Sequence, residues 1–245
     1  MKSLTKILLV AALITSATYT YAKPVKTTNV KAYYDTQDRH LSGFNAVDAE
    51  GSFDVYITQG SVESVKVEAP TAAMEYIVTE VVDGTLRIHN KHNHQSNKDW
   101  NNNKKVKVYV TVRDIDAIGV SGSGDAFFKD GIHADNLKIR VSGSGDVYGT
   151  IETKELTCSI SGSGNMKLNG HAENSTVSVS GSGNYKGGDV STSSTTVQVS
   201  GSGNATINAS NNITAAVSGS GDVRYKGGAQ HVIKSKSGSG DISED

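Results

Sequence analysis

The chain contains few of the residues that cross-link or stiffen a small exported domain. Its 245 residues include one cysteine, two prolines and one tryptophan. Because Cys158 has no second cysteine to pair with, no intrachain disulfide can form, even in an oxidising compartment. Stability must therefore come from buried apolar surface and from hydrogen bonds.

The N-terminus lacks an apolar run long enough for a membrane span. Its apolar stretch covers residues 7–14, far short of the roughly 20 residues that a spanning helix needs. Two lysines precede this stretch, and small and polar residues follow it as far as Ala22. This order is typical of a secretory signal peptide. We expect residues 1–22 to be that leader, cleaved after Ala22 or alternatively after Ala17, and the product to be exported without a membrane span.

A large excess of charge of either sign is also missing. The chain has 24 basic and 25 acidic residues. Removing residues 1–22 takes away Lys2 and Lys6, which leaves 22 basic residues (24 − 2) and a formal net charge of −3 (22 − 25). Nucleic acid and anionic membrane surfaces attract basic proteins. We therefore expect neither as a partner.

Glycine and serine are abundant, and they recur as an SGSG tetrad. The tetrads are separated by 21, 19, 19, 20, 18 and 19 residues. They begin at Ser121, Ser142, Ser161, Ser180, Ser200, Ser218 and Ser237. A flexible linker has no reason to keep a period, so the tetrads indicate a structural repeat.

The residues before each tetrad alternate between apolar and polar. Leu137, Ile139 and Val141 precede the second tetrad at alternate positions, and Cys158 occupies one of the same positions in the next repeat. This alternation is typical of a half-buried strand. Each repeat therefore carries a strand that runs into its SGSG turn. Cys158 is expected to be a small buried residue rather than a reactive thiol.

A single strand of this kind cannot bury its apolar face, but copies stacked in register bury one another. A period of about 19–20 residues suits one coil of a β-helix, with a perimeter on the order of 60 Å and coils about 4.8 Å apart. We expect glycine at the second and fourth tetrad places to take positive φ and to let coils approach closely. The predicted fold is all-β, a parallel β-helix that forms one domain over residues 44–245.

An acidic or amide residue follows every tetrad. These residues are Asp125, Asp146, Asn165, Asn184, Asn204, Asp222 and Asp241. Mixed amides and carboxylates favour a hydrogen-bonded ladder over a row of carboxylates about 5 Å apart, which would repel one another. We therefore predict a structural corner ladder with no metal or other cofactor. Calcium binding is an alternative, because calcium-binding β-rolls also combine Gly-rich turns with aspartate.

The N-terminal third lacks the tetrad but keeps the alternation of apolar and polar residues. We expect residues 23–43 to be an N-terminal extension and Gly51–Asp54 to be a degenerate first corner. Asp83-Gly84 lies between two apolar stretches and predicts a hairpin turn. A short helical turn is predicted within residues 69–76. The polar run at residues 90–105 is predicted to be a long exposed loop.

These segments together resemble a known bacterial family. The stretch "FNAVDAEGSFDVYITQG", the later "VKVYVTV" and the repeated "VSGSGD" and "VSGSGN" are similar to the putative auto-transporter adhesin, head GIN domain family. The resemblance extends from about Phe44 to Ile242. It implies a right-handed parallel β-helix and a role in adhesion or surface binding. It brings no catalytic residues with it.

The polar loop contains the main candidates for metal or ligand binding. His89, His92 and His94 are imidazole ligands that could hold Zn²⁺, Cu²⁺ or Ni²⁺. A loop gives them no fixed geometry, so a solvated polar loop is the favoured interpretation and metal binding is left open. Trp100 could stack on a sugar or a partner if it is exposed, although packing of the loop onto a coil is favoured.

Polysaccharide-cleaving enzymes need paired carboxylates, or acidic and basic groups clustered on one face. The outward-facing acids of the repeat region are expected to lie on different coils and turn sides. They are Asp130, Asp135, Glu152, Glu155 and Glu173. No Ser-His-Asp, phosphate-loop or dinucleotide motif is present. We therefore predict that the protein is not an enzyme.

The leading functional hypothesis is an exported, non-enzymatic adhesin or envelope-binding protein. Segments such as "STVSVS" and "STSSTTVQVS" are expected to place rows of short hydroxyl and amide groups on a flat outer surface. The expected partner is a glycan or a surface protein, met in the periplasm, at the cell surface or outside the cell. The alternatives are a structural envelope protein without a specific ligand and a carbohydrate-active enzyme.

Overall fold

The computed structural model describes residues 33–91 and 105–245, all within one compact unit. The expected leader lies outside the described residues. Within them the chain is all-β apart from one short 3₁₀ turn, η1 (Met74–Tyr76), and no helix has the length and apolarity to cross a membrane. The strands are β1 (Tyr34–Asp38), β2 (Ala46–Gly51), β3 (Phe53–Gln59), β4 (Ser64–Pro70), β5 (Ile77–Val82), β6 (Thr85–Asn90), β7 (Val106–Val112), β8 (Ala117–Gly122), β9 (Ala126–Gly143), β10 (Val147–Gly162), β11 (Asn165–Gly181), β12 (Asn184–Gly201), β13 (Asn204–Gly219), β14 (Val223–Lys226), β15 (His231–Gly238) and β16 (Ile242–Glu244).

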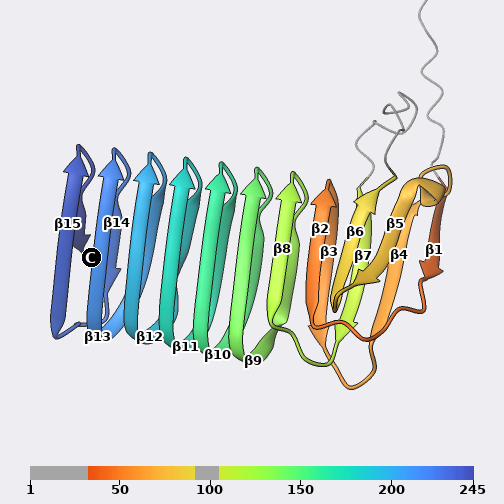
Figure 1. The fold of residues 1–245 in the computed structure, drawn as a ribbon, viewed down its shortest axis with the longest axis horizontal. Coiled ribbons are helices and arrows are strands. Elements are labelled where there is room, and N and C mark those ends of the chain that lie inside the picture. The colour runs from red at the N-terminus through yellow and green to blue at the C-terminus, as the bar shows by residue number, and fades with distance from the viewer. Residues whose placement is uncertain (1–32, 92–104) are drawn as a thin grey trace, which may run out of the picture. The chain divides into compact units, whose positions relative to one another are not determined.

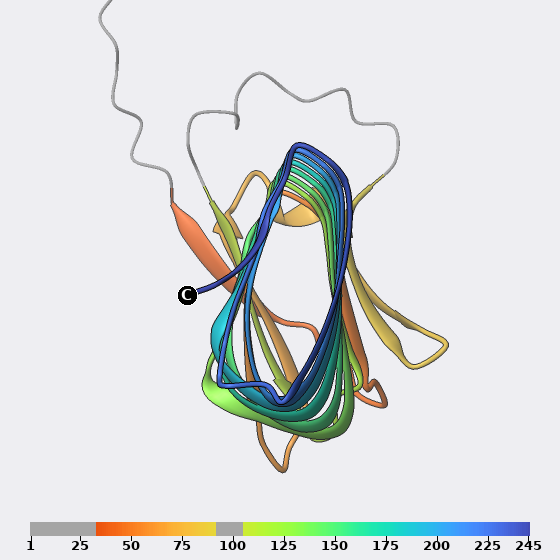
Figure 2. The same ribbon diagram turned by 90° about the vertical axis from the view of Figure 1, so that its left-hand side faces the viewer.

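Parallel strands stacked coil upon coil build most of the described chain. Strands β9 to β13 pair in sequence order, and each runs from one corner around the far turn into the next corner. Figure 1 shows these strands side by side, and Figure 2 shows their coils superimposed. Val147 pairs with Met166, and Met166 pairs with Tyr185, so each of these coils takes 19 residues. The predicted parallel β-helix is confirmed.

Alternation along each coil separates the core from the surface. On β10, Leu156, Cys158 and Ile160 are buried, whereas Thr157 between them is exposed. The equivalent residues of neighbouring coils stack on them, so apolar side chains form columns inside the solenoid. Burial raises the pKa of the Cys158 thiol. Cys158 is thus a core residue, as its position in the repeat predicts.

The two glycines of an SGSG corner are required for different reasons. Gly143 has a φ of 123°, and a Cβ on it would lie 2.5 Å from the carbonyl oxygen of Gly122 in the preceding coil. That oxygen accepts the backbone N–H groups of Ser144 and Gly145 at 2.8 and 3.0 Å. Gly145, at the fourth place, does not have positive φ, which corrects the prediction. A Cβ there would overlap the carbonyl oxygen of Gly124, so close approach between coils requires this glycine.

The N-terminal coils are stacked in a different order from the sequence. Strand β6 pairs in parallel with β2, and β7 pairs in parallel with β3. On their other sides, β2 and β3 pair with β8 and β9. The coil of β2 and β3 is therefore sandwiched between the coil of β6 and β7 and the coil that begins with β8. In the chain, however, β6 and β7 come between β3 and β8. Gly51 pairs with Gly122, which confirms that Gly51–Asp54 is a degenerate first corner.

Antiparallel strands complete this end of the stack. Strand β5 pairs with β6, β4 with β7, and β1 with β4, all antiparallel. Asp83 and Gly84 join β5 to β6 with φ of 49° and 73°. Positive φ at both turn residues is typical of a type I′ hairpin, so the predicted turn is confirmed. The helical turn η1 falls within residues 69–76, as expected, and the predicted extension contains β1.

Charged residues replace apolar ones at the C-terminal end. Lys234 and Lys236 on β15 pair with Ala215 and Val217, which are buried in the preceding coil. Both lysines are exposed, and the Lys234 ammonium lies 4.7 Å from the centroid of the Tyr225 ring. Charged residues at inward positions discourage the addition of another strand. The terminal coil is therefore polar at positions that are apolar in the coil before it.

Candidate binding faces of the solenoid

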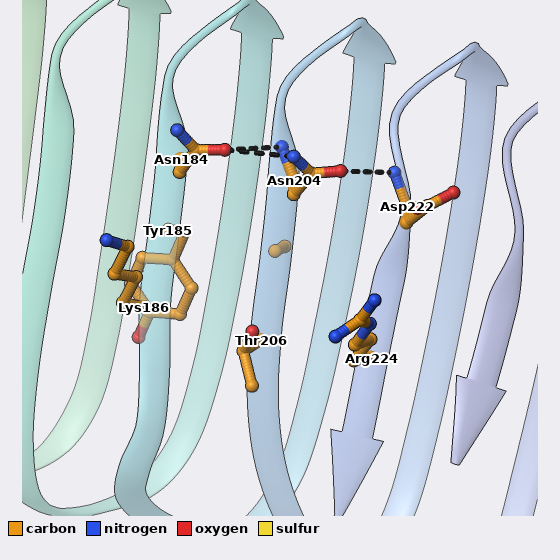
Figure 3. Close-up of a pocket in the computed structure, with 8 residues that line it drawn as sticks. Asn184, Tyr185, Lys186, Asn204, Thr206, Asp222 and Arg224 are labelled. Atoms are coloured by element: carbon orange, nitrogen blue, oxygen red, sulfur yellow. Dashed lines mark hydrogen bonds between the residues drawn. The ribbon is translucent and has the colours of Figure 1, made fainter. Parts of the chain in front are cut away.

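The residues that follow the seven tetrads, which we name the Asx column, lie along one edge of the solenoid. Figure 3 shows two steps of this column, in which a side-chain oxygen faces the backbone of the next coil. Asn184 Oδ1 accepts the backbone N–H and the Nδ2 group of Asn204 at 3.2 and 3.0 Å, and Asn204 Oδ1 accepts the backbone N–H of Asp222 at 2.9 Å. The same backbone contact recurs at other steps with distances of 2.8 to 3.0 Å. The column therefore satisfies corner N–H groups that would otherwise lack a partner.

Amides occupy the middle of the Asx column, and acids occupy its two ends. Asn165, Asn184 and Asn204 each add an Nδ2 donor to the preceding oxygen, at 2.8 to 3.0 Å. In residues 33–91 and 105–245, no group of three or more histidine, cysteine or acidic side chains is arranged to hold a metal ion. That the column has a purely structural role stays a prediction.

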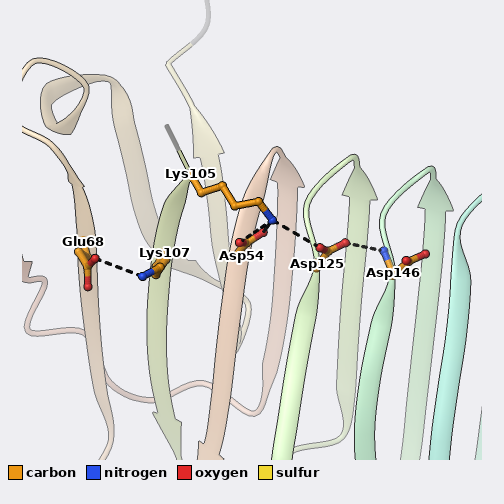
Figure 4. A network of polar contacts seen from close by, with 6 residues as sticks. All are labelled: Asp54, Glu68, Lys105, Lys107, Asp125 and Asp146. Carbon is orange, nitrogen blue, oxygen red and sulfur yellow. Dashed lines mark hydrogen bonds and ion pairs between the residues drawn. The ribbon is translucent and has the colours of Figure 1, made fainter. Parts of the chain in front are cut away.

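Asp54, the last residue of the degenerate first corner, extends the Asx column by one coil. It is 5% exposed. Lys105 Nζ lies 3.0 Å from Asp54 Oδ2 and 3.9 Å from Asp125 Oδ2 (Figure 4). The hydrogen bond to Asp54 raises the pKa of Lys105. Phe53 replaces the last glycine of the tetrad here, but Gly51-Ser52 and the following aspartate keep the pattern.

The inbound face, made of the strand segments that run into the corners, carries columns of short hydroxyl side chains. The pairing of β10 to β13 aligns them across four coils, and most are exposed. We name this set the hydroxyl face; it comprises Thr157, Thr176, Thr196, Thr214, Ser159, Ser178, Ser161, Ser180, Ser200 and Ser218. The outward hydroxyl rows predicted from the sequence are therefore present. Ser175 and Thr195 of the same segments are buried instead.

The outbound face, made of the segments that leave the corners, carries a stack of aromatic rings. Tyr109, Tyr56, Phe127 and Tyr148 come from β7, β3, β9 and β10. Neighbouring ring centroids are 5.1 to 5.5 Å apart, with interplanar angles of 8 to 20°. The Tyr148 hydroxyl donates to Asp146 Oδ2 at 2.8 Å, and this bond raises the pKa of Tyr148 to about 12. Sequence reasoning did not find this stack, because Tyr56 and Tyr109 lie outside the tetrad repeat.

The line of the rings continues into cationic residues on the following coils. Tyr148 pairs with Lys167, Lys167 with Lys186, Lys186 with Thr206, and Thr206 with Arg224. We name these five residues with the three preceding rings the aromatic–cationic row. A hollow of about 290 Å³ lies between its cationic part and the Asx column (Figure 3). This part of the outbound face is therefore both recessed and basic.

A second hollow, of about 620 Å³, lies at the far turn of the coils. Glu152 pairs with His133 and with His171, and all three line the hollow. Asp135 and Glu173 also line it. Asp135, Glu152 and Glu173 lie on different coils, as expected, but the expectation of different turn sides is wrong for these three of the five acids. His133, Glu152 and His171 are 19 residues apart in the sequence, and this spacing could have shown that the three residues stack. Asp130 and Glu155 are not in this lining.

The predicted histidine cluster is described only in part. His89 lies on β6, and its Nε2 is 3.1 Å from Glu80 Oε1. His92, His94 and Trp100 lie outside the described residues. Metal binding by the three histidines therefore stays an open hypothesis.

Known structures share this fold. A putative adhesin from Bacteroides fragilis is 27% identical and has a TM-score of 0.80, over 87% of this chain and 97% of that chain. A putative lipid binding protein from Parabacteroides distasonis is 24% identical, with a TM-score of 0.69 over 88% of this chain and 98% of that chain. A putative adhesin from Parabacteroides merdae is 22% identical, with a TM-score of 0.66 over 88% of this chain and 97% of that chain. The last two show the fold alone.

A comparison with curated proteins finds no match. The comparison with protein families finds the putative auto-transporter adhesin, head GIN domain, over residues 43–229. That range includes the degenerate first corner, both N-terminal coils and six of the seven SGSG corners. The chain therefore belongs to the putative auto-transporter adhesin, head GIN domain family.

Proposed function

We propose that the protein is an exported, non-enzymatic adhesin that binds a glycan or a surface protein through the hydroxyl face. Family membership supports surface binding in general. The observation that carries the proposal is the alignment of ten short hydroxyl side chains over four coils. The N-terminal leader pattern supports export to the periplasm, the cell surface or the medium.

The physical chemistry of this face suits an extended polar ligand. Each hydroxyl both donates and accepts hydrogen bonds, as sugar hydroxyls do. The columns repeat every 4.8 Å or so along the stack, on backbone that the sheet holds rigid. Serine and threonine have few rotatable bonds, so binding orders little that was mobile before. A flat surface of this kind contacts a chain or a protein better than it encloses a small molecule.

Replacing two central hydroxyls tests the proposal. Thr176→Val with Thr196→Val keeps the side-chain shape and removes two donors and acceptors from the hydroxyl face. We expect the wild-type chain to capture ligands on a glycan array or from envelope extracts, and the double variant to capture them several-fold less well. Thr58→Val, at an exposed position on β3, is the control and should leave capture unchanged. No capture by folded wild-type protein would favour a structural envelope role instead.

A carbohydrate-active enzyme is the second candidate, because the hollow at the far turn gathers His133, Glu152 and His171. Acidic and imidazole groups on one face are the types used in general acid–base catalysis. The non-enzymatic proposal predicts that incubation with envelope and host polysaccharides releases no new chain ends. If the wild-type chain releases new chain ends and Glu152→Gln does not, the protein is a carbohydrate-active enzyme and the non-enzymatic proposal is wrong.

A further inference from the structure

We infer that the aromatic–cationic row on the outbound face is a second binding site, and that its ligand is a linear polysaccharide whose sugars carry carboxylates. This goes beyond the proposed function, because the hydroxyl face lies on the inbound segments of the same coils. The inference depends on the stacked rings, on the cations that continue their line, and on the hollow beside those cations.

The rings form a rigid apolar ridge. Each ring packs against the next, and hydrogen bonds fix both ends, since Tyr148 donates to Asp146 at 2.8 Å and Tyr109 donates to Glu68 at 3.2 Å. Tyr109 is 37% exposed, and Phe127 and Tyr148 are partly exposed. A ligand therefore meets ring edges that are already ordered. The ring faces cover one another, so the edges offer apolar area that the C–H surfaces of sugars can bury.

The cations beyond the rings carry charge that the protein does not neutralise. Among the described residues, Lys167, Lys186 and Arg224 have no ion-pair partner. Lys107 and Lys154, by contrast, pair with Glu68 and Asp135 at 3.5 and 2.8 Å. All three unpaired cations are exposed, and they lie in the same row on β11, β12 and β14. Their positive charge is therefore available to an anionic ligand.

The neighbouring part of the Asx column leaves this charge largely intact. The amides Asn184 and Asn204 line the hollow beside Lys186, and only Asp222 contributes a carboxylate, near Arg224. The Thr206 hydroxyl lies between the two cations in the row (Figure 3). The hollow thus offers hydrogen-bonding groups flanked by a lysine and an arginine. Arginine binds carboxylate in a bidentate manner.

The length of the row favours a chain over a single sugar. Eight strands contribute to it, in the spatial order β7, β3 and then β9 to β14, so it spans about 34 Å at about 4.8 Å per strand. Lys186 and Arg224 are two strands apart, on the order of 10 Å. Charges at such intervals match a polymer with one acidic group on each of several sugars. The rings at the other end of the row add apolar contacts, which a ligand bound by its charge alone would not use.

Binding of polygalacturonate to the full chain tests the inference, and its methyl ester is the matched neutral probe. We expect polygalacturonate to bind and the ester to bind at least tenfold more weakly. The double variant Lys186→Gln with Arg224→Gln should weaken polygalacturonate binding by roughly tenfold or more, because it removes two charge-assisted contacts. Phe127→Leu with Tyr148→Leu should weaken it several-fold without a change in net charge.

The matched control removes one lysine and one arginine from the inbound face. Lys138→Gln with Arg140→Gln makes the same change in net charge at two exposed positions, and should leave binding within about twofold of wild type, because these residues lie off the row. Equal weakening by both pairs, no binding by the wild-type chain, or equal affinity for a single-stranded oligonucleotide would overturn the inference. The threonine variants of the hydroxyl face should keep polygalacturonate binding, which separates failure of this site from failure of the proposed function.

Discussion

At the scale of single residues, the corners show how the stack satisfies its own backbone. The first glycine of every tetrad except the last accepts two N–H groups from the following corner, and five of the seven Asx side chains accept one backbone N–H more. A corner that turns away from sheet pairing would otherwise leave these donors without partners. Serine at the intervening positions is exposed, so the tetrad combines obligatory glycines with replaceable serines.

The Asx column gives the first prediction. Asn184→Ala removes the donor to Asn165 Oδ1, at 2.8 Å, and leaves the backbone N–H of Asn204 without its acceptor. We expect a loss of about 1–3 kcal/mol in the free energy of unfolding, measured by denaturant titration. Asn184→Asp keeps the acceptor and should lose less. Asn211→Ala, at an exposed position, is the control. An equal loss of unfolding free energy in this variant would contradict a structural role for the Asx column.

Tyr148 gives a prediction about pH. Its hydrogen bond to Asp146 raises its pKa to about 12 from an ordinary value near 10. The folded state therefore holds this proton more tightly than the unfolded state does. The resulting stabilisation is fully present below about pH 10 and is lost as the pH rises towards 12.

Ultraviolet titration of tyrosinate checks the raised pKa of Tyr148. Subtracting the curve of Tyr148→Phe from that of the wild-type chain should leave one transition with a midpoint near pH 12. A midpoint near 10 would show that the hydrogen bond does not hold the phenol in its neutral form.

At the scale of strands and coils, the sequence predicts the repeating part well and the N-terminal part less well. Alternating residues such as Ile139 and Val141 fix which side of a strand is buried, and the period fixes the coil. The placement of β6 and β7 beyond β2 and β3 has no such signal, because parallel pairing is non-local. The stack of Tyr56 with Phe127 depends on that placement, so the aromatic–cationic row could not be predicted either.

The last long strand gives a prediction at this scale. Lys234 and Lys236 occupy inward positions on β15, where earlier coils carry Ala215 and Val217. Replacing both lysines with valine creates an apolar, unpaired edge, which is a template for pairing with another chain. We expect Lys234→Val with Lys236→Val to form oligomers whose mass rises with concentration in light scattering.

The control for the β15 variant removes the same amount of charge and leaves the β15 edge unchanged. Lys138→Val with Arg140→Val removes two cations from exposed outward positions of β9. This pair should remain in the same oligomeric state as the wild-type chain. Equal association of the two variants would show that lost charge, and not the open edge, drives the oligomers.

At the scale of the described unit, each coil contacts only its neighbours, so the solenoid is close to a one-dimensional stack. Strands β10, β11 and β12 pair in turn, while contacts between non-adjacent coils are minor. Stability in such an array is approximately a sum of terms for each coil and each interface. The binding rows on both faces are built in the same way, since each coil adds one residue to every row.

Removing one whole coil tests this description. Deletion of residues 166–184 joins Asn165 to Tyr185, and Tyr185 then takes the place of Met166 on Val147, because Met166 and Tyr185 occupy equivalent positions. Every corner and every buried column stays in register, so we expect a folded chain with the same β-type circular dichroism per residue and a smaller denaturant m-value. Deletion of residues 166–175 removes about half a coil and brings a far turn against a corner. That variant should fail to fold, and similar behaviour of the two deletions would contradict a stack of interchangeable coils.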